Sequence, residues 1–263
     1  MRFDLETFKQ RSGRLDDSDI DYDRFRTEPL DEASLRCLRY MHDVEFHTAC
    51  YLRDVLVTRA HAEPDVTAFL SCWAYEELWH GEAIAKVLAA HGEPAGRTRV
   101  AVLRAGVGLR GRLAPWASLA VSSLTRHVVA VQVTWGAVNE WTTQAAYGRL
   151  ASVSGHPVLG DLLGRIMRQE GRHIDYYASQ AVERLGASTR AQRITRWALT
   201  TMWAPVGSSV MPAGEVRHLH AHLFSGPEGV ATLARIDRRI DRLPGLGGLG
   251  LLSHRSTTLS PAA

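Results

Sequence analysis

Residues 77–80 read Glu-Leu-Trp-His and residues 170–173 read Glu-Gly-Arg-His, so one Glu-x-x-His spacing occurs twice in the chain. A lone glutamate precedes each motif at a similar interval. Glu45 lies 32 residues before the first motif, and Glu140 lies 30 residues before the second. The order Glu, Glu-x-x-His, Glu, Glu-x-x-His, with each part in an apolar helical segment, predicts a two-metal carboxylate site in a four-helix bundle.

Four segments with helical apolar periodicity carry these residues. Their expected ranges are about 34 to 63, 65 to 90, 116 to 150 and 157 to 186. Within the third segment, residues 117–138 are apolar enough to suggest a membrane-spanning helix. Because Arg126, His127 and Gln132 interrupt that stretch, we interpret it as a helix of the bundle core.

Length and composition indicate one large globular domain, or a domain with appendages. The chain has 263 residues, of which 45% are apolar and 22% are charged. We expect an acidic N-terminal arm at residues 1–32 and a metal-binding helical bundle at residues 33–186, with a basic insertion at about residues 92–116. We expect a C-terminal helical extension with a glycine-rich tail at residues 187–263, with helices near 191–203 and 229–242.

Cysteine usage and the N-terminus bear on localisation. The three cysteines, Cys37, Cys50 and Cys72, have no CxxC spacing and an odd count, which favours a reducing compartment. Residues 1–10 are charged throughout and have no apolar signal core. We therefore expect a cytoplasmic protein without a transmembrane segment.

The distribution of charge is uneven although the net charge is only +3. Residues 94–139 contain no Asp or Glu, and their arginines are Arg97, Arg99, Arg104, Arg110, Arg112 and Arg126. Such a segment suits an anionic partner: an acyl-carrier protein, the phosphates of a coenzyme A thioester, or lipid headgroups. A solvated basic insertion without a partner is the alternative. Nucleic acid is not expected, because no nucleic-acid-binding motif accompanies the arginines.

Four glutamates on buried helix stripes require neutralisation, since unpaired buried carboxylates are very costly. Two divalent cations would supply four positive charges. The i, i+3 spacing places the Glu and the His of each motif on one helix face, so each pair can bind one metal while the lone glutamates complete or bridge the site. Carboxylate and imidazole ligands favour iron, with manganese as the alternative.

A third Glu-x-x-His occurs at Glu215 and His218. It follows a break at residues 205–214 and has no partner glutamate at the right interval, so we interpret it as chance. The neighbouring His220 and His222 leave a secondary metal site as the alternative.

Residues 76–81, Glu-Glu-Leu-Trp-His-Gly, resemble the Glu-Glu-x-x-His-Gly motif of the soluble acyl-[acyl-carrier-protein] desaturases, members of the ferritin-like di-iron carboxylate superfamily. Residues 139–143 (Asn-Glu-Trp-Thr-Thr), 148–151 (Gly-Arg-Leu-Ala) and 170–173 are similar to that family's third and fourth helices. The resemblance covers about residues 39–185. It implies an all-α, ferritin-like four-helix bundle, here with extra helices in the insertion and at the C-terminus.

The resemblance also implies roles for individual residues. The iron ligands would be Glu45, Glu77, His80, Glu140, Glu170 and His173. The hydroxyl of Thr143 would assist oxygen activation. The family further implies two Fe ions cycling between Fe2+ and Fe3+, O2 as co-substrate, and a homodimer.

These observations favour an O2-dependent di-iron oxidoreductase that acts on an apolar substrate. The expected reaction is desaturation or hydroxylation of an acyl chain or small metabolite carried as a thioester. The alternatives are an N-oxygenase of a small secondary metabolite, a ferroxidase or other iron-handling bundle, and a non-catalytic binding bundle. The sequence shows no electron-transfer module, so we expect a separate ferredoxin or reductase as electron donor.

Four tryptophans lie on the segments that carry the expected ligands: Trp73, Trp79, Trp135 and Trp141. We interpret them as core packing. Walls of a substrate pocket, or a route for electrons, are the alternatives.

Overall fold

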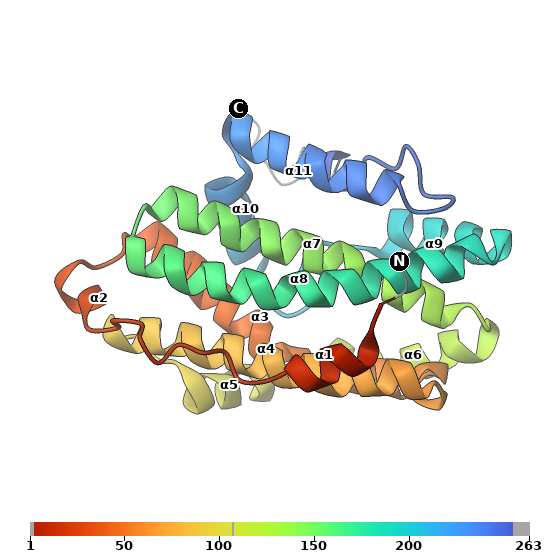
Figure 1. Ribbon diagram of the computed structural model, residues 1–263, viewed down its shortest axis with the longest axis horizontal. Helices are drawn as coiled ribbons and strands as arrows, with labels where there is room; N and C mark the ends of the chain where they lie inside the picture. The colour runs from red at the N-terminus through yellow and green to blue at the C-terminus, as the bar shows by residue number, and fades with distance from the viewer. Residues whose placement is uncertain (1–2, 107, 255–263) are drawn as a thin grey trace.

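Four long helices form the body of the molecule (Figure 1): α3 (Glu32–Leu56), α4 (Pro64–Ala90), α7 (Val128–Ser154) and α8 (Pro157–Gly186). The computed structural model describes residues 3–106 and 108–254, except for the side chain of Arg110. Every regular element in these ranges is helical. The predicted all-α architecture is confirmed.

The four helices pack as two layers, α3 with α4 and α7 with α8. Short connections join the partners within each layer. The α3–α4 connection contains a 3-10 turn, η1 (Arg59–Ala62), and α7 ends at Gly155, whose positive φ of 61° favours glycine. A long connection between the layers contains α5 (Gly96–Ala105) and α6 (Leu109–Leu124). One long crossover of this kind is typical of ferritin-like bundles.

Local sequence explains where several bundle helices begin. The Asp31 side chain accepts a hydrogen bond from the backbone N–H of Ser34 at 2.9 Å and so caps α3. Pro64 and Pro157 occupy the first turns of α4 and α8, where the missing N–H costs nothing. The predicted starts of these helices therefore agree with the structure to within about two residues.

The third bundle helix is shorter than we predicted. Residues 116–150 were expected to form one helix, but α6 ends at Leu124 and α7 begins at Val128. Thr125 between them has an extended backbone, and its Oγ1 accepts a hydrogen bond from the backbone N–H of His127 at 3.1 Å. This local bond competes with helix formation, so the chain turns without a proline or glycine.

The N-terminal segment is more than a solvated arm. It contains two short helices, α1 (Leu5–Arg11) and α2 (Arg24–Thr27), and α1 lies along α4 (Figure 1). Phe8 and Phe25 are buried in the main hydrophobic core. The many aspartates of this segment obscure the few large apolar residues that anchor it.

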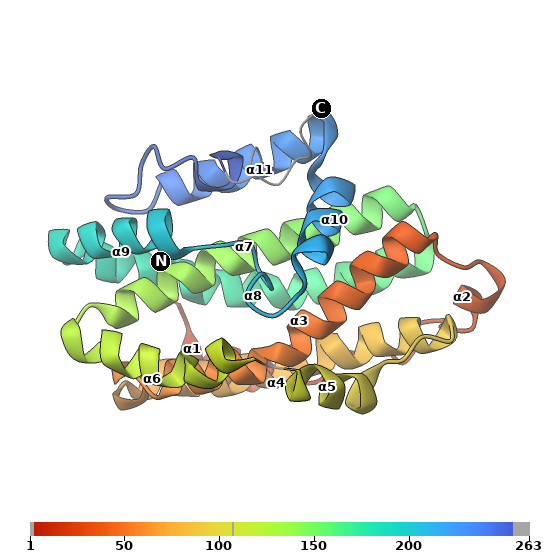
Figure 2. The same cartoon turned by 180° about the vertical axis from the view of Figure 1, so that it is seen from behind.

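The C-terminal extension covers the α3 and α7 side of the bundle (Figure 2) with α9 (Thr189–Met202), α10 (Ala213–Phe224) and α11 (Gly226–Asp241). Helices α9 and α11 match the predicted C-terminal helices, whereas α10 was not predicted. Residues 255–263 of the predicted tail lie outside the described residues. Trp203, at the end of α9, is fully buried and donates a hydrogen bond from Nε1 to Asn139 Oδ1 at 3.1 Å.

The core runs through the bundle, and its members are mostly aliphatic side chains of the four long helices. Fully buried examples are Leu38, Ile84, Leu88, Leu150, Leu159, Leu162 and Leu163. None of the helices in the described part of the chain is both long and apolar enough to span a bilayer.

Helices α7 and α8 approach closely at one glycine. A Cβ atom on Gly136 would lie 2.5 Å from the ring of Tyr177, which is shorter than any normal contact. Gly160 in α8 is different, because a Cβ there would have no neighbour within 4 Å. Only the first glycine is therefore required by packing.

We expect Gly136→Ala to lower the free energy of unfolding by about 1–3 kcal/mol, because the added methyl group forces the Tyr177 ring to move. The matched control, Gly160→Ala, should raise stability by about 0.5–1 kcal/mol through its helix propensity. Urea denaturation of both variants tests this. Equal stability of the two variants would contradict the packing argument.

Candidate metal centre

The structure brings the six predicted ligand residues together in the middle of the bundle. They come from α3 (Glu45), α4 (Glu77 and His80), α7 (Glu140) and α8 (Glu170 and His173). All six side chains are buried. The i, i+3 spacing places the Glu and His of each motif on one helix face, as the sequence predicts.

Their ligand atoms form two overlapping groups. One consists of Glu45, Glu77, His80 and Glu170, and the other of Glu77, Glu140, Glu170 and His173. Within each group, one atom from every residue lies within 4.8 Å of the others. Glu77 and Glu170 belong to both groups. The carboxylates placed to bridge are therefore those of the Glu-x-x-His motifs, whereas Glu45 and Glu140 each belong to one group.

Both imidazoles present Nδ1 to the carboxylates. His80 Nδ1 lies 3.1 Å from Glu77 Oε2 and 3.3 Å from Glu170 Oε1. His173 Nδ1 lies 3.0 Å from Glu170 Oε2 and 3.2 Å from Glu77 Oε1. A metal bound here would take Nδ1 of each histidine, leaving each Nε2 to an outer partner.

The outer partners of the histidines are Gln169 and Glu76, which directly precede the second and first motif glutamates. His80 Nε2 lies 2.9 Å from Gln169 Oε1, and His173 Nε2 lies 2.8 Å from Glu76 Oε2. Such bonds fix the orientation of ligand imidazoles. We did not predict this role from sequence. The sequence did contain one hint, since a second acid, Glu76, directly precedes the first motif. The structure shows that Glu76 is buried together with the motif.

Gly13 of the N-terminal segment contacts both outer partners. Its N–H donates to Glu76 Oε1 at 3.1 Å, and its carbonyl accepts from Gln169 Nε2 at 3.2 Å. Arg172 Nη2 also donates to Glu76 Oε1, at 2.7 Å. A segment more than sixty residues away in sequence thus completes the hydrogen bonding behind the ligands.

Two other side chains donate to the carboxylates that belong to one group each. Trp73 Nε1 donates to Glu140 Oε1 at 3.0 Å, and the Tyr147 hydroxyl donates to Glu45 Oε1. Trp73 therefore does more than pack in the core. Hydrogen-bonded carboxylates of this kind are held in one orientation.

Electrostatics divides the four carboxylates into two types. Burial and the charges of neighbouring glutamates raise the pKa values of Glu45 and Glu140. Burial would also raise the pKa values of Glu77 and Glu170, but hydrogen bonds from His173 and His80 outweigh it and hold them below the usual value. These two carboxylates are therefore the anionic ones.

The histidines show the complementary shift. Burial lowers the pKa of His80, but hydrogen bonds to Glu170 and Glu77 outweigh it and raise the pKa to about 10. These pKa shifts favour protons on the two histidines and on Glu45 and Glu140. A metal must displace these protons, so metal affinity should fall as the pH falls.

The residues present fit a pair of divalent metal ions. Glu170 Oε1 is buried, and its one close polar neighbour among the described residues is His80 Nδ1, at 3.3 Å and without good hydrogen-bond geometry. A buried carboxylate oxygen that is this poorly satisfied favours a bound cation. Hard carboxylate oxygens and two imidazole nitrogens suit iron or manganese.

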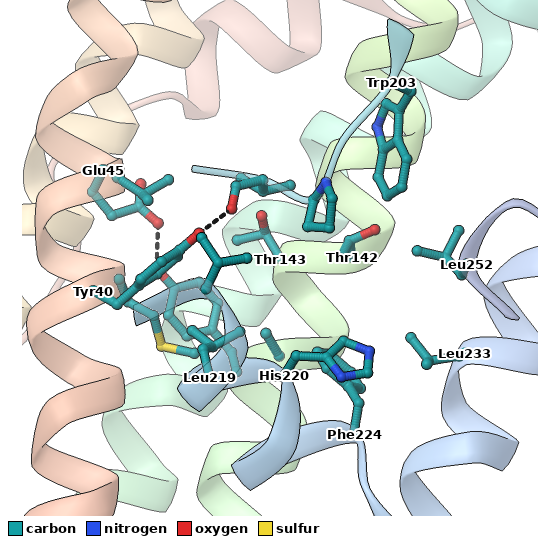
Figure 3. Close-up of a pocket in the computed structure, with 17 residues that line it drawn as sticks. Tyr40, Glu45, Thr142, Thr143, Trp203, Leu219, His220, Phe224, Leu233 and Leu252 are labelled. Atoms are coloured by element: carbon teal, nitrogen blue, oxygen red, sulfur yellow. Dashed lines mark hydrogen bonds between the residues drawn. The ribbon is translucent and has the colours of Figure 1, made fainter. Parts of the chain in front are cut away.

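Two cavities meet beside the cluster of ligand residues, at Glu45 and Thr143. The larger one, about 260 Å³, is lined by all four glutamates and by Tyr51, Trp73, Trp135 and the chain at 204–210. The narrower one, about 60 Å³, lies under α10 and α11. Figure 3 shows Glu45 at one end of the narrow cavity and Leu233 and Leu252 at the other. Its lining is almost entirely apolar.

Thr143 lines both cavities, as do Val44, Glu45, Pro205 and Val206. The preceding Thr142 instead donates its hydroxyl to the carbonyl of Val138 on its own helix, at 2.7 Å. The hydroxyl at position 143 is thus the one at the junction of the two cavities.

The remaining predicted residues are placed elsewhere. Glu215 pairs with Arg36 at 2.8 Å, and His218 Nε2 lies 3.2 Å from the carbonyl oxygen of Ala33. In the basic insertion, Arg99 pairs with buried Asp43 at 2.6 Å, and Arg104 donates to the carbonyl of Phe46 at 3.2 Å. These two arginines attach the insertion to α3.

Comparisons with known proteins give a match in fold but not in sequence. No family model matches this chain. No curated protein matches its sequence. Solved structures of R2-like ligand-binding oxidases do match its fold, over most of its length.

One such structure, a variant with an aerobically reconstituted Fe/Fe cofactor, is 15% identical, with a TM-score of 0.54 over 97% of this chain and 89% of that one. A variant with a Mn/Fe cofactor is 16% identical, with a TM-score of 0.56 over the same shares. A third, with a Mn/Fe cofactor after a long soak, is 15% identical, with a TM-score of 0.53 over 97% and 88%. At this identity the similarity shows the fold, and the predicted ferritin-like bundle is confirmed.

Proposed function

We propose that this protein is a non-haem, di-metal, O2-dependent oxidoreductase that acts on an apolar organic substrate. The observation that carries the proposal is the pair of overlapping ligand groups, which share Glu77 and Glu170 in a fully buried cluster. Two bound redox metals would supply the electrons and the oxygen chemistry. The R2-like oxidases of the same fold carry Fe/Fe or Mn/Fe, so both pairs suit the six ligands proposed here.

The narrow cavity supports an organic substrate in addition to metal binding. A ferroxidase needs a path for ions, which polar side chains would line. The narrow cavity that reaches Glu45 is mostly apolar, whereas the larger cavity also has polar residues such as Thr48 and Asn139. The end of an apolar chain that reached the narrow cavity would lie beside Glu45 and Thr143. We therefore favour desaturation or hydroxylation of an acyl chain or a similar apolar molecule, carried as a thioester.

Metal binding is the first consequence of this proposal. Anaerobic ferrous loading should give about two irons per chain and raise the melting temperature, because metal binds only the folded protein. Glu77→Ala and Glu170→Ala each remove a shared carboxylate, so both should lose most of the iron. Elemental analysis and thermal melts measure these changes.

Glu215→Ala is the matched control, since Glu215 lies outside both ligand groups. It should bind as much iron as the parent. Absence of stoichiometric iron and manganese in the parent protein would refute the di-metal proposal.

Thr143 is proposed to assist the oxygen reaction, as the family resemblance implies. Thr143→Val keeps the volume and removes the hydroxyl at the junction of the cavities. We expect iron content to stay unchanged and product formed per electron consumed to fall roughly tenfold or more. Thr142→Val is the control, because Thr142 lines only the narrow cavity and its hydroxyl donates to the helix backbone. An equal yield of product per electron in both variants would contradict the role of Thr143.

An external electron donor is also part of the proposal. A groove of about 830 Å³ lies between α11 and the α7–α8 pair, and Trp141 lines it. Arg149 in this groove pairs with Glu228 at 2.5 Å, while the exposed arginines that line it are Arg235, Arg238, Arg239 and Arg242. A positive groove of this kind would attract an acidic redox protein.

The groove continues to Arg172, which connects it to the metal centre. Arg172 donates to Glu76, and Glu76 contacts the ligand residue His173. Neither this groove nor its continuation is lined by any of the six ligand residues, so a substrate placed there would be separated from the metals. Electrons can cross the layer of side chains between the groove and the metals, whereas a substrate cannot.

We expect the Arg238→Glu, Arg239→Glu double variant to slow reduction of the loaded centre by an acidic plant-type ferredoxin about tenfold at low ionic strength. The control pair, Arg190→Glu with Arg193→Glu on α9, carries the same change of charge on another helix. Stopped-flow reduction measures the rate. Dithionite should reduce both variants equally, and equal rates with ferredoxin would exclude this groove as the docking site.

A further inference from the structure

Helix α6 turns its large apolar side chains away from the protein. Leu109, Leu113, Trp116 and Leu124 follow one another at three- and four-residue steps or their multiples, so they share one face. Their exposed fractions are 71%, 50%, 69% and 83%. Val102 on the neighbouring helix α5 is 70% exposed. Isolated exposed apolar residues are ordinary, but a row of this length on one helix is not.

The opposite face of α6 consists of small residues, and it is this face that packs on the bundle. Its residues are Gly111, Pro115, Ser118 and Ser122. Ser122 is buried, and its Oγ accepts a hydrogen bond from the backbone N–H of Arg59 at 2.9 Å. The Gly111 carbonyl accepts from Arg53 of α3 at 3.2 Å. Helix α6 is therefore amphipathic in the reverse sense of an ordinary surface helix.

The segment that contains α6 carries charges of one sign only. Residues 94–139 contain no acid, and Arg97, Arg112 and Arg126 are exposed there. A helix that presents leucine and tryptophan to its surroundings, with arginines alongside, is typical of proteins that lie on anionic membranes. Tryptophan is especially favoured at the depth of the lipid headgroups.

We propose that the outward face of α6, together with the arginines of the acid-free segment, is a docking surface for an anionic lipid membrane. A second copy of the chain is a poorer occupant. Symmetric packing of α6 against α6 would bring together two acid-free, arginine-bearing segments, whose positive charges would repel each other. An anionic lipid surface would bury the apolar face of α6 and pair its headgroups with the arginines. The surface is peripheral, in keeping with the absence of a spanning helix among the described residues.

Cosedimentation with vesicles tests this surface without reference to metal or activity. The full chain should bind vesicles of phosphatidylcholine mixed with phosphatidylglycerol, bind pure phosphatidylcholine far less, and dissociate as salt is raised. Leu113→Ala combined with Trp116→Ala should lower the partition coefficient about tenfold or more. Arg112→Gln should lower it about fivefold.

Trp197→Ala is the matched control, because Trp197 on α9 is also a highly exposed tryptophan, at 60%. It should bind like the parent. Circular dichroism of each variant shows that the fold is retained. Three results would overturn the proposal: no binding by the parent, equal loss in the Trp197 and α6 variants, or a parent dimer that the α6 variant dissociates while vesicles bind neither form.

Discussion

Four carboxylates buried in one bundle core are the constraint on which the rest of the structure depends. Each would be prohibitively costly alone. The structure solves this by placing Glu77 and Glu170 between two imidazoles, and by giving Glu45 and Glu140 neutral donors, Tyr147 and Trp73. Every one of these groups lies on a bundle helix, so the register of the four helices and the geometry of the cluster determine each other.

The same constraint also acts on the residues that contact the two histidines from outside. Glu76 and Gln169 must be oriented as well, or the imidazoles could rotate. Both are bonded to Gly13, which belongs to a segment that Phe8 and Phe25 anchor in the core. The N-terminal segment is thereby a structural part of the site, although its composition resembles that of a solvated arm.

Helical spacing explains why so much of the site was predictable. Glu77 and His80 share a face because of the helical period alone, and the prolines at 64 and 157 define two of the helix starts. What the sequence could not supply depends on contacts between helices. That Glu77 and Glu170 occupy the shared position, rather than Glu45 and Glu140, depends on how the four helices pack against one another. The break at Thr125 likewise depends on a local hydrogen bond that no residue-type signal marks.

The error at residues 116–124 has a more general cause. An apolar stripe on a helix is normally assigned to the core, and that assumption extended the third bundle helix backwards through Trp116. In α6 the assumption fails, because the contacts with α3 and with the chain at Arg59 are made through a glycine carbonyl and a serine hydroxyl. Small residues allow the close approach that those backbone and guanidinium bonds need. The large apolar residues are then left exposed on the outer face. An apolar stripe on a helix is therefore not sufficient evidence that the helix belongs to the protein's core.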